Sequence, residues 1–145
     1  MNINFREATL EDKGFLLDAN KEINQLSGLD DSTFDMNIDK DLYEEPSCKV
    51  IVAEENGQRI GFVLYSYIYW ANCGKGIYLS QVYVKKEWRN KGIFKMLLRE
   101  LEKREKDCKF ITDYVGRENE VMLKSMEKIG FRSSDLNIFY KKIHD

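Results

Sequence analysis

A short basic turn, Arg89-Asn90-Lys91-Gly92, carries the residue types that most clearly fit a chemical role. Gly92 has no Cβ to obstruct an approaching anion, and Asn90 tolerates the unusual backbone dihedral angles that such a turn requires. If a helix begins here, the free N–H groups of its first turn, with cationic side chains around them, would bind phosphate. A solvent-exposed basic turn would have the same composition. The sequence contains neither the Rossmann nor the Walker glycine-rich fingerprint.

The residues on either side of this turn predict the elements that hold it. Val82 and Val84 alternate with Gln81 and Tyr83, which is the period of a strand. After the turn, apolar residues recur at helical spacing at Ile93, Phe94, Leu97, Leu98 and Leu101. The pattern therefore predicts a strand, an anion-binding turn and an amphipathic helix in succession.

The rest of the chain predicts further strands and helices. Strands are expected at residues 2–6, 50–53, 60–69, 77–84, 109–115 and 137–143, with helices at 9–26 and 118–129 besides the one after the basic turn. Thr9 offers an N-cap for the first helix, and Asn56-Gly57 is a strong hairpin signal. This order indicates a mixed α/β fold.

An acidic segment follows the first helix and continues to Pro46. Its carboxylates are Asp30, Asp31, Asp35, Asp39, Asp41, Glu44 and Glu45, and interspersed apolar residues allow a second, shorter helix. One interpretation is a charged surface in solvent. The other is that these carboxylates draw a cationic amine toward a cleft.

Length and composition exclude several classes of protein. A chain of 145 residues with 43% hydrophobic and 33% charged residues fits one globular domain, residues 1–145. The formal net charge of −2 gives no electrostatic case for nucleic-acid binding. There is no apolar run of about 20 residues and no signal-peptide segment, so we expect no membrane partner and a cytoplasmic protein.

The cysteines and the histidine argue against metal or triad chemistry. Cys48, Cys73 and Cys108 are odd in number and widely spaced, which disfavours a disulfide framework and a zinc site. His144 is the only histidine, and it lies next to the C-terminal residue. We therefore expect no metal and no Ser-His-Asp or Cys-His catalytic unit.

Three separated motifs resemble those of the GCN5-related N-acetyltransferase (GNAT) superfamily. Val84 followed by Arg89–Phe94 resembles its acyl-CoA-binding motif, although Phe94 stands where the family has a small residue. Gly61-Phe62-Val63 matches a middle strand, and Asn119 with Glu127–Phe131 resembles the late helix that ends in Lys-x-Gly-Phe. The resemblance implies a mostly antiparallel central sheet flanked by helices.

The same resemblance implies acetyl-CoA as cosubstrate. The pyrophosphate would lie on the loop amides, with charge from Arg89 and Lys91, and the pantetheine arm would pair with the strand as an added strand. The residues implied for cofactor binding are Val82, Tyr83, Val84, Arg89, Asn90, Lys91, Gly92, Ile93, Phe94, Lys95 and Asn119. Asn119 would equally suit a helix N-cap.

The stretch from Gly74 to Val84 is similar to the diamine and polyamine acetyltransferases of the spermidine/spermine or thialysine type. Ser80 and Gln81 stand where that subgroup has Glu-Asp, so the substrate-handling carboxylate is replaced by side chains that cannot act as bases near neutral pH. These two residues are the candidate substrate contacts.

The family's acid is also replaced. Met126 occupies the position of the tyrosine that protonates the leaving thiolate, and methionine cannot donate a proton. Tyr114, Tyr140 or Tyr83 could supply the acid instead, and a base could come from the acidic segment through water. Tyr114 and Tyr140 are our candidate catalytic residues.

Two classes of function follow. The first is an N-acetyltransferase acting on a primary amine of a small molecule, polyamine or amino-acid-like, by direct attack in a ternary complex; a protein N-terminus or lysine is the alternative acceptor. The second is a CoA-binding sensor or interaction domain with reduced or lost catalysis. Homodimer formation is left open.

Overall fold

The computed structural model describes residues 1–26, 38–137, 139 and 141. These residues group into two compact units, Met1–Asp113 and Tyr114–Asp145. The first unit holds the sheet and the basic turn, and the second holds the late helix. Each unit is described by itself below.

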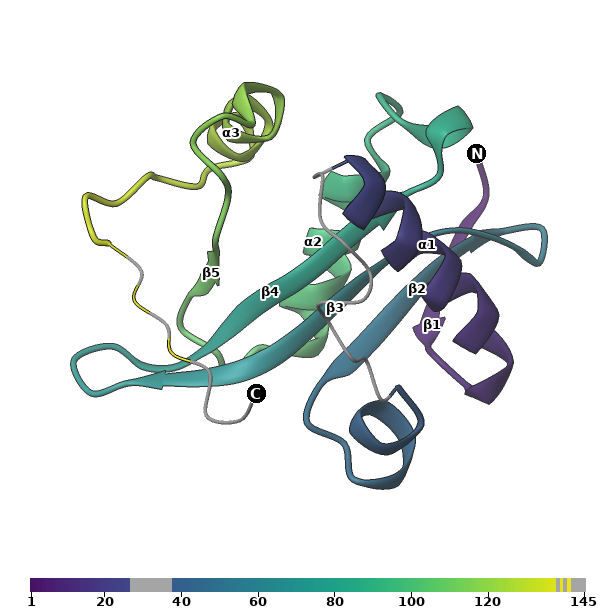
Figure 1. Ribbon diagram of the computed structural model, residues 1–145, viewed down its shortest axis with the longest axis horizontal. Coiled ribbons are helices and arrows are strands. Elements are labelled where there is room, and N and C mark those ends of the chain that lie inside the picture. Colours follow the sequence, from purple (N-terminus) through teal and green to yellow (C-terminus); the bar gives the residue numbers. More distant parts are fainter. Residues whose placement is uncertain (27–37, 138, 140, 142–145) are drawn as a thin grey trace. The chain divides into compact units, whose positions relative to one another are not determined.

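A five-stranded sheet forms the frame of the first unit (Figure 1). Its strands lie in the order of the sequence: β1 (Ile3–Glu7), β2 (Lys49–Glu55), β3 (Gln58–Trp70), β4 (Gly74–Val84) and β5 (Ile111–Asp113). The first four pair antiparallel, and β5 pairs parallel with β4. The predicted mixed, mostly antiparallel sheet is confirmed.

The hairpin between β2 and β3 turns at Asn56-Gly57, as its sequence predicts. Both residues have positive φ angles, 49° at Asn56 and 79° at Gly57. Two successive left-handed residues match the twist of the flanking strands, which explains why this dipeptide is favoured there. The turn thereby fixes the register of the central strands.

The helices α1 (Lys13–Leu26) and α2 (Ile93–Arg104) cover opposite faces of the sheet in the first unit (Figure 1). Three short helices accompany them: η1 (Leu10–Asp12), η3 (Asp39–Glu44) and η4 (Lys86–Trp88). Leu16 and Ala19 of α1 are buried in one core cluster with Phe62 of β3. The buried side of α2 consists of Ile93, Leu97, Leu98 and Leu101, as its apolar spacing predicts. No helix among the described residues has the length and hydrophobicity that a membrane span requires.

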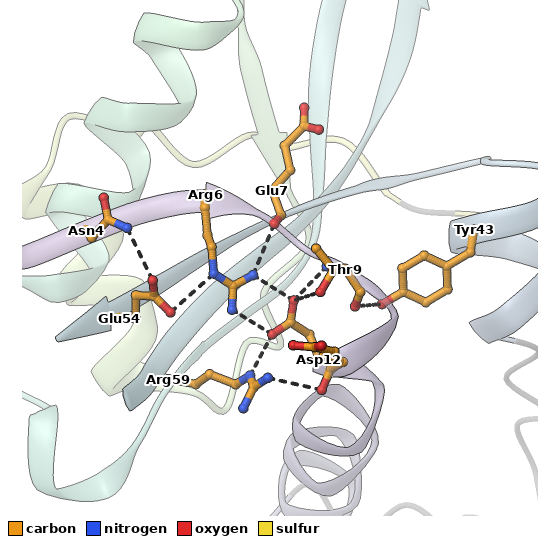
Figure 2. A network of polar contacts seen from close by, with 9 residues as sticks. Asn4, Arg6, Glu7, Thr9, Asp12, Tyr43, Glu54 and Arg59 are labelled. Carbon is orange, nitrogen blue, oxygen red and sulfur yellow. Dashed lines mark hydrogen bonds and ion pairs between the residues drawn. The ribbon is translucent and has the colours of Figure 1, made fainter. Parts of the chain in front are cut away.

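A buried carboxylate fixes the start of α1 (Figure 2). Asp12 is 0% exposed, and its oxygens accept hydrogen bonds from Arg6 of β1 at 2.8 and 2.9 Å and from Arg59 Nε of β3 at 2.6 Å. The Thr9 N–H also donates to Asp12 Oδ2, at 2.7 Å. One side chain thus joins two strands, β1 and β3, to the entry of α1.

The second unit contains α3 (Glu120–Lys128). The Asn119 side chain accepts from the Met122 N–H at 3.2 Å, so Asn119 is the N-cap of this helix. Met126 is 6% exposed, in agreement with its core spacing in the sequence. The late helix is confirmed within two residues at its start and one at its end.

Two expected strands differ from the structure, and one expected helix is present in part of its segment. The strand expected at 109–115 is shorter, because β5 pairs with β4 over three residues and lies within Ile111–Asp113. The strand expected at 137–143 falls mainly outside the described residues, and Asn137, Phe139 and Lys141 are not in a strand. The short helix expected in the acidic segment is present as η3, while Asp30, Asp31 and Asp35 lie outside the described residues.

Candidate active site

A β-bulge interrupts β4 where the candidate substrate residues lie. Leu64 of β3 faces Gln81, but the next residue, Tyr65, faces Leu79, so Ser80 is an extra residue without a partner on β3. Such a bulge bends its strand and redirects the side chains around it. Ser80 is exposed, whereas Leu79 beside it is fully buried.

Beyond the bulge, β4 has an unpaired edge. Its pairing with β5 covers Ile77, Tyr78 and Leu79 and stops there. Within the described chain, residues 81–84 therefore pair with β3 on one side, and no strand pairs with them on the other. An extended ligand that carries amides can bind to such an edge as an added strand.

The basic turn follows this edge after the short helix η4 and leads into α2. Asn90 and Gly92 adopt left-handed conformations, with φ angles of 62° and 81°. The Met96 N–H donates to the Gly92 carbonyl at 3.0 Å, so the three preceding N–H groups, of Ile93, Phe94 and Lys95, have no acceptor within the helix. These groups and the positive end of the helix dipole favour an anion at this point.

The space beside Gly92 is open. A Cβ atom added there would have no described atom within 4 Å. Phe94 is half-buried in the first turn of α2, and the helix begins normally at Ile93 despite this large residue. The side of Gly92 on which a Cβ would lie is therefore not blocked by the described part of the chain.

The side chain of Arg89 is already engaged. Its Nε donates to the Val84 carbonyl at 2.8 Å, and its Nη2 donates to Glu22 of α1 at 2.9 Å. Lys91 Nζ lies 5.0 Å from the centre of the Trp88 ring. Arg89 thus holds the turn against β4 and α1, and Lys91 is the more available of the two cations that we expected beside the phosphates.

Polar side chains of α1 meet β4 on the face opposite α2. Asn20 accepts a hydrogen bond from Gln81 Nε2 at 3.1 Å, and Glu22 accepts one from the Tyr83 hydroxyl at 2.5 Å. Burial and the Glu22 carboxylate raise the pKa of Tyr83 to about 12. Because its proton is held by Glu22, Tyr83 is a poor acid for a leaving thiolate, and the idea that it substitutes for the missing acid is not favoured.

The other candidates lie outside the first unit. Tyr114, half-exposed, and Asn119 belong to the second unit, and Tyr140 lies outside the described residues. The structure thus brings together Ser80–Val84 and Arg89–Lys95. The roles of Tyr114, Tyr140 and Asn119 remain predictions.

Two residues of this site escaped sequence reasoning. Asn20 and Glu22 lie on α1, where the sequence shows them as part of its polar side. The Glu22 contact spans 67 residues of sequence, and no local signal marks it.

A strand with an unpaired edge, followed by a helix N-terminus with free N–H groups, is the arrangement that the GNAT resemblance implies. The model of the acetyltransferase (GNAT) family matches residues 16–131. The chain therefore belongs to this family, and the expected class, an acyl-CoA-dependent acetyltransferase, is confirmed. No curated protein matches the chain in sequence.

Solved structures share the whole fold at low sequence identity. A possible acetyltransferase from Clostridium difficile 630 is 22% identical, with a TM-score of 0.78 over 99% of this chain and 100% of that one. AAC(6')-Iy, in complex with the bisubstrate analogue CoA-S-monomethyl-acetylneamine, is 20% identical, with a TM-score of 0.78 over 98% and 99%. A predicted acetyltransferase with acetyl-CoA from Clostridium acetobutylicum is 21% identical, with a TM-score of 0.71 over 97% and 96%.

Proposed function

We propose that this protein transfers an acetyl group from acetyl-CoA to a primary amine of a small molecule. The observation that carries the proposal is the continuity of the unpaired β4 edge, Ser80–Val84, with the left-handed turn and the free N–H groups of α2. One extended ligand with amides at one end and a pyrophosphate at the other fits both parts.

The residues divide the binding between them. The backbone of Val82, Tyr83 and Val84 would hold the pantetheine arm, and the N–H groups of Asn90 to Lys95 would hold the pyrophosphate. The family resemblance implies that Asn119 also contacts the arm. Acetyl-CoA supplies the activated thioester, and the protein supplies alignment, which alone is worth several kcal/mol.

Proton transfer sets the demands on the remaining residues. A free alkylamine has a pKa of about 10, so it must lose a proton before it attacks near pH 7. Ser80 and Gln81 cannot take that proton, and a carboxylate of the acidic segment could do so through water. We assign the acid for the leaving thiolate to Tyr114 or Tyr140.

The acceptor class is supported from two directions. The stretch 74–84 resembles polyamine acetyltransferases, and AAC(6')-Iy, of similar fold, is an aminoglycoside acetyltransferase. Polyamines and aminoglycosides are both small cations with several primary amines. We therefore propose a small polyamine or amino-acid-like amine, with an aminoglycoside as the next candidate.

Binding of acetyl-CoA should stabilise the native state. A ligand at 100 times its dissociation constant adds about 2.7 kcal/mol, which raises the melting temperature of a chain of this length by about 5–10 °C. Thermal unfolding with and without saturating acetyl-CoA measures this, with ATP, which lacks the pantetheine arm, as the control. An unchanged melting temperature would rule out the cofactor assignment.

Turnover with a panel of amines tests the reaction itself. Thiol release from acetyl-CoA is followed with spermidine, lysine, neamine and a peptide with a free N-terminus. We expect release with a small amine, and on that amine either Tyr114→Phe or Tyr140→Phe should lower kcat at least tenfold. Release with the peptide alone would refute the acceptor class. Binding without release from any amine would favour the sensor function instead.

A further inference from the structure

Glu22 on α1 connects that helix to the turn before α2. Its Oε1 accepts from Arg89 Nη2 at 2.9 Å, and its Oε2 accepts from the Tyr83 hydroxyl at 2.5 Å. Both oxygens of one carboxylate are therefore used, one on the turn and one on β4. The hydrogen bond from Tyr83, and then Arg89, hold the pKa of Glu22 below its ordinary value, so the carboxylate stays ionised near neutral pH.

The partner on β4 is itself held rigidly. The Tyr83 ring packs edge-on against Phe15 of α1, with ring centres 5.9 Å apart, and it lies 5.8 Å from the ring of Phe62 on β3. Three aromatic rings thus fix the position of the hydroxyl that donates to Glu22. The hydrogen bond from this hydroxyl holds the Glu22 carboxylate in place, although the Glu22 side chain is 38% exposed.

Arg89 transfers the constraint to the turn. Its Nε bonds to the carbonyl of Val84, the last residue of β4, while its Nη2 bonds to Glu22. Asn90, the next residue, is in the left-handed conformation, and Gly92 follows in the same conformation. Because these two hydrogen bonds hold the Arg89 side chain, they restrain the direction in which the backbone enters the turn.

We propose that Glu22 is a positioning residue for the cofactor loop, which it orients through Arg89. The inference rests on the proposed function, because it supposes that this loop binds the pyrophosphate of acetyl-CoA. A carboxylate beside a phosphate site opposes binding through charge alone. Glu22 nevertheless lies beside this loop, and we attribute this to its hydrogen bonds, which support the geometry of the loop as such bonds often do in active sites.

Removal of Glu22 should weaken binding of the phosphate-bearing end of the cofactor and nothing else. We expect Glu22→Ala to raise Kd and KM for acetyl-CoA about tenfold, as for loss of a charged hydrogen bond, with kcat within about twofold. S-acetylpantetheine lacks the pyrophosphate, so its kcat/KM should not change. Glu22→Gln keeps an acceptor for Arg89 and should restore most of the affinity.

The matched control is Asp18→Asn, which removes the same charge from an exposed position on the same helix. It should leave Kd for acetyl-CoA unchanged. Should Glu22→Ala not fold, Glu22→Asp serves in its place, because it keeps the charge while its shorter side chain cannot reach Arg89 and Tyr83 as Glu22 does. That variant should raise Kd for acetyl-CoA and leave S-acetylpantetheine unaffected.

The outcomes separate this inference from the function beneath it. Wild-type protein that does not bind acetyl-CoA would overturn both. Wild-type binding that Glu22→Ala does not alter would overturn the positioning role alone. An equal loss with acetyl-CoA and S-acetylpantetheine would also overturn it, because it would show a general structural defect. An equal loss of acetyl-CoA affinity in Asp18→Asn would show that the effect comes from the charge of α1, and it would refute the role of Arg89.

Discussion

Replacement of Gly92 with aspartate is expected to weaken acetyl-CoA binding at least about 100-fold, whereas asparagine should weaken it far less. Both residues tolerate the left-handed φ of 81° at this position, and neither side chain meets a described atom near its Cβ. The two variants differ in charge alone. Two unit charges about 5 Å apart interact with about 3 kcal/mol at an effective dielectric constant of about 20.

Calorimetric titration of both variants with acetyl-CoA measures the difference. Each variant should unfold cooperatively within a few degrees of the wild type, since Gly92 is exposed. Added salt should narrow the gap between Gly92→Asp and Gly92→Asn, because it screens the repulsion. Equal affinities for the two variants would show that no phosphate lies at this turn.

Much of the frame around this turn could be predicted, because its signals are local. Asn56-Gly57 determines a hairpin through the backbone freedom of two adjacent residues. Leu97, Leu98 and Leu101 recur at helical spacing and are buried in α2. The left-handed Asn90 and Gly92 follow from residue type, so the backbone conformation of the basic turn could be predicted from the sequence.

The details that complete the site depend on pairing across the fold. The bulge at Ser80 arises from the register of β4 against β3, and Ser80 alternates along its own strand like an ordinary residue. The unpaired edge exists because the pairing of β5 with β4 ends at Leu79 of β4, although the sequence around β5 suggests a longer strand. Neither property is encoded in a window of neighbouring residues.

The partners of charged side chains could not be predicted from the sequence either. The family resemblance implies that Arg89 adds charge near the phosphates, and the structure adds hydrogen bonds from Arg89 to Val84 and Glu22 that the sequence does not predict. A helical acid such as Glu22 has many exposed equivalents in this sequence, and only the crossing of α1 over β4 selects it. Asp12 lies within the helix expected at 9–26, but its two arginine partners come from β1 and β3, the strands on either side of β2.

Those partners make Asp12→Ala the substitution with the largest expected effect on stability. Asp12 is fully buried, while the side chains of Arg6 and Arg59 remain about a third exposed, at 30% and 33%. Removal of the carboxylate leaves two arginines without their shared partner, at a cost of about 3 kcal/mol, and water at the arginines keeps the cost near the low end of the usual range. The melting temperature should fall by about 10 °C.

The dependence on pH separates this effect from simple loss of packing. The Arg6 hydrogen bond, with help from Arg59 and the Thr9 N–H, holds the pKa of Asp12 well below its ordinary value. As pH falls below about 4, the unfolded chain therefore takes up this proton before the folded chain does, and the stabilisation present at higher pH is lost. Denaturant unfolding of wild type and Asp12→Asn from pH 7 to 3 should show that the difference between their free energies of unfolding shrinks at the acid end.

The control is the neighbouring Glu11→Ala, at an exposed acid, which should change the free energy of unfolding by less than about 0.5 kcal/mol. A wild-type advantage that stayed constant down to pH 3 would mean that the ion pairs of Asp12 do not stabilise the fold.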